Sequence, residues 1–164
     1  VGYALDERST FIREFVNWLK STNLMIEFDV FLVKPSSLCS DLIGQFNSVN
    51  VQLQHAIPYK DLPNILQKYH IGVILYRGLN ENYQFNAPNK LFEYLQCGLD
   101  VWYPKVMQGI VDYDTIDTPK VIGLDMTQLS QMCLETLLEN SKFSLQTYSF
   151  EEVYRPLQLK LTQL

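Results

Sequence analysis

The residues whose types and spacing favour chemistry lie between Asn86 and Gly98, in the stretch NAPNKLFEYLQCG. Pro88 suits the first position of a helix, where its missing N–H costs nothing, and Gly98 is placed to end that helix. Ala87 precedes Pro88 and has no side-chain acceptor, so the N–H groups of the first turn stay available. Because those groups and the helix dipole favour negative charge, we expect the helix start to face an anion such as phosphate.

Two charged side chains share one face of this predicted helix. Lys90 in the first turn adds a positive charge, and Glu93 follows three residues later. A phosphate site beside a carboxylate that accepts hydroxyl groups would suit a nucleotide sugar. The alternative is that Lys90 and Glu93 form an exposed ion pair, and that water or another side chain caps the helix.

Helical and extended segments alternate along the chain, which is typical of a parallel sheet covered by helices. We therefore expect an α/β fold, with residues 78–85 as a mobile loop. Thr127 and Ser149 are the expected caps of the last two helices. The expected helices cover residues 7–20, 41–46, 60–69, 88–97, 127–138 and a segment from 149 onward, and the expected strands cover 27–33, 49–53, 71–76, 101–103 and 121–124.

Ligands of open parallel sheets bind beyond the carboxyl ends of the strands, and this rule selects further residues. Arg77 follows the strand 71–76, and its guanidinium could bind two phosphate oxygens. The alternative for Arg77 is a loop residue that points into water. Tyr59 could lie along a nucleotide base, or it could be a turn residue that packs on its own helix. The candidates at the helix start are Asn86, Pro88, Asn89 and Lys90.

Composition narrows the class of protein. The 164 residues are 47% hydrophobic and 13% aromatic, enough for the core of one domain. The net charge of −5 argues against a nucleic-acid partner, and no apolar run approaches the roughly 20 residues of a membrane span. Three separated cysteines without a CxxC pair suggest neither disulfides nor zinc, and fit a reducing cytosol.

Other motifs are absent or weak. The chain has no GxGxxG and no GxxxxGK[ST], which argues against dehydrogenases and P-loop kinases. His55 and His70 stand alone, so we expect structural roles for both. The acidic residues Asp112, Asp114 and Asp117 lack the glycine and terminal glutamate of a calcium loop, which favours a solvated loop and no metal.

Several segments together resemble the C-terminal half of GT-B-fold glycosyltransferases of the group-1 type, in order and in spacing. They are YKDLPNIL at 59–66, IGVILYR at 71–77, PNKLFEYL at 88–95, and the pair Cys97 and Gly98. The resemblance implies a Rossmann-like, doubly wound and mostly parallel sheet with helices on both faces. It also implies that residues 1–164 form one nucleotide-sugar-binding domain, the C-terminal half of a two-domain protein.

The resemblance assigns roles to individual residues. Glu93 would hold the ribose hydroxyls of the donor, and the turn at 88–90 would face its diphosphate. Many members carry an arginine and a lysine after the first strand of this domain; here Arg8 lies near that place and no lysine follows soon. Many members also carry a second glutamate, which contacts the donor sugar, at the position of Phe85.

The implied activity is transfer of a hexose from a nucleoside diphosphate sugar to an acceptor such as a polysaccharide intermediate. The resemblance implies retention of configuration, no metal or other cofactor, a bacterial polysaccharide pathway, and an acceptor site and catalytic base in an N-terminal half. This half alone would bind the donor weakly and not turn over. We expect a cytoplasmic location, with membrane contact at the inner face only through the other half. The alternatives are a scaffold domain with a degenerate donor site, and a GT-B enzyme that uses a phospho-sugar.

Overall fold

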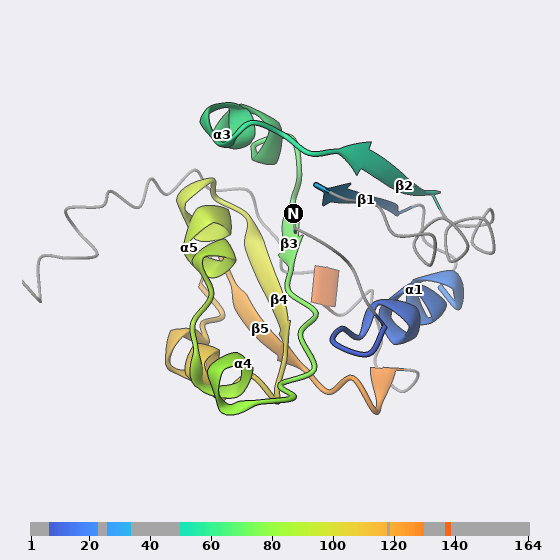
Figure 1. Cartoon of the computed structure of the whole chain (residues 1–164), viewed down its shortest axis with the longest axis vertical. Helices are drawn as coiled ribbons and strands as arrows, with labels where there is room; N and C mark the ends of the chain where they lie inside the picture. Colours follow the sequence, from blue (N-terminus) through green and yellow to red (C-terminus); the bar gives the residue numbers. More distant parts are fainter. Residues whose placement is uncertain (1–6, 23–25, 34–49, 118, 130–136, 139–164) are drawn as a thin grey trace, which may run out of the picture.

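The computed structural model describes residues 7–22, 26–33, 50–117, 119–129 and 137–138. Within these ranges, helices and short parallel strands alternate as the sequence predicts, so the α/β class is confirmed (Figure 1). The expected helices at 41–46 and from 149 onward lie outside the described residues. The strands are β1 Glu27–Leu32, β2 Asn50–His55, β3 Ile71–Val73, β4 Asp100–Pro104 and β5 Val121–Leu124; the α-helices are α1 Ile12–Lys20, α3 Leu62–Leu66, α4 Glu81–Phe85 and α5 Asn89–Gln96; the 3₁₀ helices are η1 Tyr59–Asp61 and η2 Gln108–Tyr113.

The described strands form two sheets, and all their strand ladders are parallel. One sheet pairs β1 with β2, and the other has the order β3-β4-β5. The single continuous sheet that the sequence suggested is not seen among the described residues. A cavity lies between the two sheets and is lined by all of β1, all of β3 and the Lys90 and Tyr94 side chains of α5.

Helices cover both faces of the three-stranded sheet. The β4 residue Trp102 packs in one cluster with Phe15 and Trp18 of α1. Its neighbours Val101 and Tyr103 pack in a second cluster that contains the buried residues of α3 and α5. Successive side chains of a strand point to opposite faces, so this alternation places α1 on one face and α3 with α5 on the other.

Several expected elements begin or end at other residues than predicted. The helix expected over 7–20 begins at Ile12, because Thr10 instead forms an antiparallel bridge with Tyr76. The helix expected over 60–69 divides into η1 and α3 and ends at Leu66. Tyr76, expected inside a strand, lies three residues past the end of β3.

The loop expected over residues 78–85 is wrong in part, because Glu81–Phe85 forms helix α4. The Asn80 side chain accepts a hydrogen bond from the Tyr83 backbone N–H at 3.0 Å and so caps this helix. The Thr127 backbone N–H and hydroxyl both donate to Asp125. Most of the helix that Thr127 was expected to cap lies outside the described residues.

Candidate functional site

The start of α5 has no side-chain cap. The helix begins at Asn89, one residue later than predicted. Pro88 is its extended N-cap residue, with ψ of 150°, and not its first helical residue. The Pro88 carbonyl accepts a hydrogen bond from Leu91 N–H at 2.9 Å. Gly98, with φ of +77°, follows the last turn in the left-handed conformation, as expected of a residue that ends a helix. Pro88 therefore supplies no side-chain acceptor to the first-turn N–H groups, and no other side chain of the described residues is seen to cap them.

Lys90 is held at this helix start by Tyr76. The Lys90 Nζ donates to the Tyr76 hydroxyl at 3.0 Å and lies 4.9 Å from the centroid of the same ring. Tyr76 in turn stacks on Tyr83 of α4, with 5.1 Å between ring centroids. These contacts place a half-buried ammonium group beyond the carboxyl end of β3, where ligands of parallel sheets bind.

The Lys90 ammonium retains binding capacity. A protonated lysine has three N–H donors, and the Tyr76 hydroxyl takes one of them. No ion pair joins Lys90 to Glu93; the described ion pairs are those of Arg13 with Glu7 and of Arg77 with Glu14. The interpretation as an exposed Lys90–Glu93 ion pair is therefore wrong.

Glu93 is half-buried on α5, one turn beyond Lys90. Its negative charge acts on its neighbours: burial first, and then Glu93, raise the pKa of the Cys97 thiol and of the Tyr94 hydroxyl above their ordinary values. No ion pair holds the Glu93 carboxylate in the part of the chain that the structure describes. It can therefore accept hydrogen bonds from hydroxyl groups of a ligand.

Arg77 contacts the segment that leads into α1. Its Nε donates to the carbonyl oxygens of Glu7 and Thr10, both at 2.9 Å, and its Nη2 pairs with Glu14 Oε1 at 2.6 Å. The guanidinium also lies 4.4 Å from the centroid of the Phe11 ring. The interpretation of Arg77 as a loop residue in water is wrong, because it anchors this segment to the end of β3; its role as a phosphate ligand stays a prediction.

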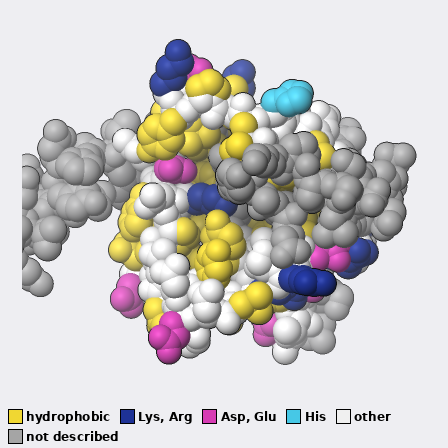
Figure 2. All heavy atoms as spheres, in the orientation of Figure 1, with side chains coloured by type: hydrophobic (Ala, Val, Ile, Leu, Met, Phe, Trp, Pro, Cys, Tyr) yellow, Lys and Arg dark blue, Asp and Glu magenta, His cyan; other side chains and the backbone are white. Residues whose placement is uncertain are grey.

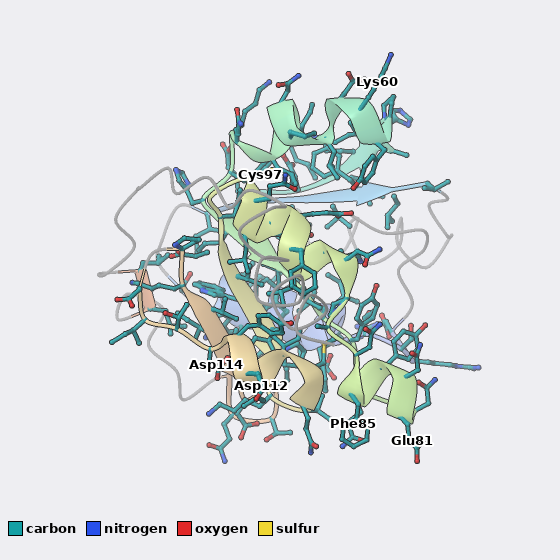
Figure 3. All side chains as sticks on the ribbon, turned by 90° about the vertical axis from the view of Figure 1, so that its left-hand side faces the viewer. Lys60, Glu81, Phe85, Cys97, Asp112 and Asp114 are labelled. Atoms are coloured by element: carbon teal, nitrogen blue, oxygen red, sulfur yellow. The ribbon has the colours of Figure 1, made fainter. Side chains whose placement is uncertain are left out.

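The remaining candidates are spread more widely. Asn86 and Asn89 are exposed on either side of Pro88, and Arg8 is exposed in the turn before α1. Tyr59 is 76% exposed on η1, so it does not pack on its own helix as the alternative proposed. Its neighbour Lys60 lies at the opposite end of the molecule from Glu81 and Phe85 (Figure 3). The structure thus gathers residues 86–93 with Tyr76, and Tyr59 stays apart from α4.

The contact of Tyr76 with Lys90 was not predicted from the sequence. Tyr76 was expected at the end of a strand, on the edge of the sheet where ligands bind, but nothing in the sequence indicated that it would accept a hydrogen bond from Lys90. Phe85, which stands where the resembled family has a glutamate, is 57% exposed at the end of α4. An apolar ring at this position makes no hydrogen bonds to sugar hydroxyls.

The described residues contain no group of three or more His, Cys, Asp or Glu side chains arranged to hold a metal ion. In the acidic loop, Asp114 accepts a hydrogen bond from the Tyr103 hydroxyl at 2.5 Å. Within the same residues, no helix combines the length and apolar character needed to cross a bilayer.

Comparison with known proteins adds no family to this geometry. No family model, no curated protein and no solved structure matches the chain.

Proposed function

We propose that this chain is the donor-binding half of a glycosyltransferase and binds the diphosphate of a nucleotide sugar at the start of α5. The observation that carries the proposal is the Lys90 ammonium, which Tyr76 holds beside a helix N-terminus without a side-chain cap. A cation and free N–H donors at one point attract phosphate oxygens from two sources. The parallel α/β architecture is consistent with a Rossmann-like, doubly wound domain.

Each residue then has a distinct role. The N–H groups at Asn89 and Lys90 and the Lys90 ammonium bind the diphosphate, and Tyr76 positions Lys90. Glu93 accepts the ribose hydroxyls. As the bond between the sugar and the diphosphate breaks, negative charge grows on the leaving phosphate, and fixed N–H dipoles and the ammonium stabilise it.

The reaction needs groups that we place in another half of the protein. The acceptor, such as a polysaccharide intermediate, and the catalytic base would bind there, across a cleft from α5. We place the enzyme in the cytoplasm, because scattered cysteines without a CxxC pair fit a reducing compartment. Any contact with the inner face of a membrane would come from the other half.

A scaffold domain with a degenerate donor site is the second candidate function. Two observations favour it. Arg77, a candidate phosphate ligand, makes its contacts with Glu7, Thr10 and Glu14. Phe85 replaces a sugar-binding glutamate of the resembled family. A scaffold would retain the fold without binding nucleotides.

A thermal-shift screen with UDP, GDP, ADP and inorganic pyrophosphate separates these candidates. Ligands that bind the native state raise the melting temperature by mass action. For the donor-binding domain we expect one nucleoside diphosphate to stabilise the protein most. Glu93→Gln should reduce the rise in melting temperature caused by that nucleotide and leave the rise caused by pyrophosphate unchanged, because only the nucleotide has ribose hydroxyls.

The matched control for this screen is Glu27→Gln, which changes the same charge on the exposed first residue of β1. It should leave the stabilisation by every ligand unchanged. The absence of any shift at millimolar nucleotide would contradict donor binding and favour the scaffold.

A further inference from the structure

A second surface of the molecule lies around α4 and η2, and it adjoins the Lys90 site through Tyr83, which stacks on Tyr76. Two chain segments, 78–86 and 106–117, come together there. A Cβ on Gly109 would meet the Phe85 carbonyl oxygen at 2.2 Å, and one on Gly78 would meet the Val106 side chain at 2.9 Å. These close approaches show that the two segments pack directly on each other.

The surface exposes large apolar side chains. Leu79 and Phe85 are 65% and 57% exposed, values high for their size. Exposed apolar groups that lie together on a protein surface commonly mark an interaction site. We call this surface, formed by residues 78–86 and 106–117, the α4–η2 patch; its exposed apolar members are Leu79, Tyr83, Phe85, Val106, Val111, Tyr113 and Ile116.

All charged side chains of the same patch are acidic. Residues 78–86 and 106–117 contain no lysine, arginine or histidine, and their acidic residues are Glu81, Asp112, Asp114 and Asp117. Glu81, Phe85, Asp112 and Asp114 all lie at the end of the molecule opposite Lys60 (Figure 3). Figure 2 shows magenta acidic side chains at the lower left rim of the molecule, near the bottom where Figure 1 draws α4.

We propose that the α4–η2 patch docks a basic amphipathic segment of a partner polypeptide, one that combines leucine or aromatic side chains with lysine or arginine. Its apolar side chains would cover Phe85 and its neighbours, and its cations would face the carboxylates. Complementary charge of this kind speeds association and selects partners. The proposal goes beyond donor binding, because neither Lys90 nor Glu93 belongs to the patch.

The charge of the patch disfavours other occupants. Arg77 and the exposed Lys105 immediately precede the two segments of the patch, but its four carboxylates outnumber them and disfavour anionic membranes and nucleic acids. A second copy of this chain docked through the same patch would bring the acidic residues of both copies together, which costs free energy at low salt. A basic polypeptide satisfies both the apolar and the charged part of the surface.

The probe for this proposal is a short, fluorescently labelled peptide with leucine, phenylalanine and lysine at helical spacing. We expect it to bind with amide NMR shift changes confined to residues 78–86 and 106–117. The double variant Glu81→Gln with Asp112→Asn should bind the peptide about tenfold more weakly at low salt, because exposed charges are little screened under that condition. Phe85→Ala should weaken it about tenfold as well, as expected for an aromatic anchor.

Matched variants separate this patch from general charge and stickiness. Glu27→Gln with Asp61→Asn removes the same charge on β1 and η1, and Tyr59→Ala removes an exposed aromatic ring near Lys60. Both variants should bind the peptide with an affinity within about twofold of the wild-type value, since the changed residues lie outside the patch. Thermal melting of every variant checks that it is folded.

Three outcomes would overturn the proposal. If the control pair at Glu27 and Asp61 lost as much peptide affinity as the pair at Glu81 and Asp112, net charge alone would attract the peptide. Equal binding of a peptide with glutamate in place of lysine would mean that the acidic residues have no role. Self-association of the wild type, abolished by Phe85→Ala in sedimentation experiments, would make a second copy the occupant.

Discussion

Lys90 and Arg77 are both cations near the end of β3, yet the fold uses them differently. Arg77 donates to two carbonyl oxygens and to the Glu14 carboxylate. Lys90 donates to one hydroxyl, which leaves two of its three N–H groups for a ligand. The sequence placed both residues near the expected site. It could not predict which of them would contact the protein, because the partners of Arg77 lie at Glu7 to Glu14, far away in the chain.

The reactivity of Cys97 tests the surroundings of Glu93. Burial and the Glu93 charge raise the pKa of the Cys97 thiol, so little of the reactive thiolate is present near neutral pH. We expect slow alkylation of Cys97 by iodoacetamide at pH 8 in the folded protein. Glu93→Gln removes one cause of the raised pKa and should accelerate the reaction, as measured by mass spectrometry of the Cys97 peptide.

The control for Cys97 is Glu27→Gln, which should leave its alkylation rate unchanged. An unchanged rate in Glu93→Gln would contradict the account, because it would mean that the Glu93 charge does not reach the thiol. Unfolding in urea should raise the rate in every variant.

At the scale of elements, α4 shows where sequence reasoning failed. Asparagine, glycine and glutamine between residues 78 and 86 suggested a loop, yet Asn80 caps a short helix by accepting from Tyr83 N–H. Such a helix has little intrinsic stability and depends on packing. That packing comes from η2 through Gly109, a contact that no local pattern reveals. Helices α1 and α5 were predicted, α1 from the helical spacing of its apolar residues and α5 from Pro88 and Gly98 at its two ends, although α1 begins later than expected, at Ile12.

Gly109→Ala tests the contact between α4 and η2. The added Cβ would meet backbone atoms of Phe85 and Asn86 at 2.2 to 2.7 Å, and backbone cannot move aside as a flexible side chain can. We expect the free energy of unfolding to fall by about 1–3 kcal/mol, measured by urea denaturation.

Gly123→Ala provides the comparison for Gly109. A Cβ on Gly123 would meet side-chain atoms of Lys105 and Tyr103 at 3.0 to 3.2 Å. Gly123→Ala should therefore lower the free energy of unfolding by less than Gly109→Ala does. An equal or smaller loss of stability in Gly109→Ala would mean that α4 and η2 do not pack as described.

At the scale of the whole molecule, the described strands form two sheets, β1-β2 and β3-β4-β5, and no ladder joins β1 to β3 among the residues that the structure describes. Strand patterns predicted five parallel strands, but which strands pair depends on contacts between distant parts of the chain, which periodicity does not reveal. One edge of β3 pairs with β4. On the other edge, the Leu75 carbonyl accepts from Phe11 N–H at 2.8 Å, and Arg77 N–H donates to Ser9 at 2.9 Å.

Amide exchange tests whether the edge of β3 that faces away from β4 is unpaired at Val73. Alternate residues of a strand direct their backbone groups to the same edge, so Val73 faces the same side as Leu75, toward the cavity that β3 lines. Ile74 N–H instead donates to the Trp102 carbonyl at 2.9 Å. We expect the Val73 amide to exchange at least about tenfold faster than that of Ile74, because the Val73 N–H has no strand partner among the described residues. Equal protection of the two amides would mean that this edge is paired in solution.

The central claim is that Lys90 binds the diphosphate of a nucleotide sugar, and calorimetric titration of Lys90→Ala tests it most directly. The ligand is the nucleoside diphosphate that stabilises the wild type most, and the matched control is Lys68→Ala, which removes an exposed lysine after α3. The account predicts that Lys90→Ala weakens binding at least about tenfold, as expected for a charged hydrogen bond, while Lys68→Ala binds like the wild type. Equal affinity of Lys90→Ala and Lys68→Ala would contradict the account, since the start of α5 would then not be the diphosphate site.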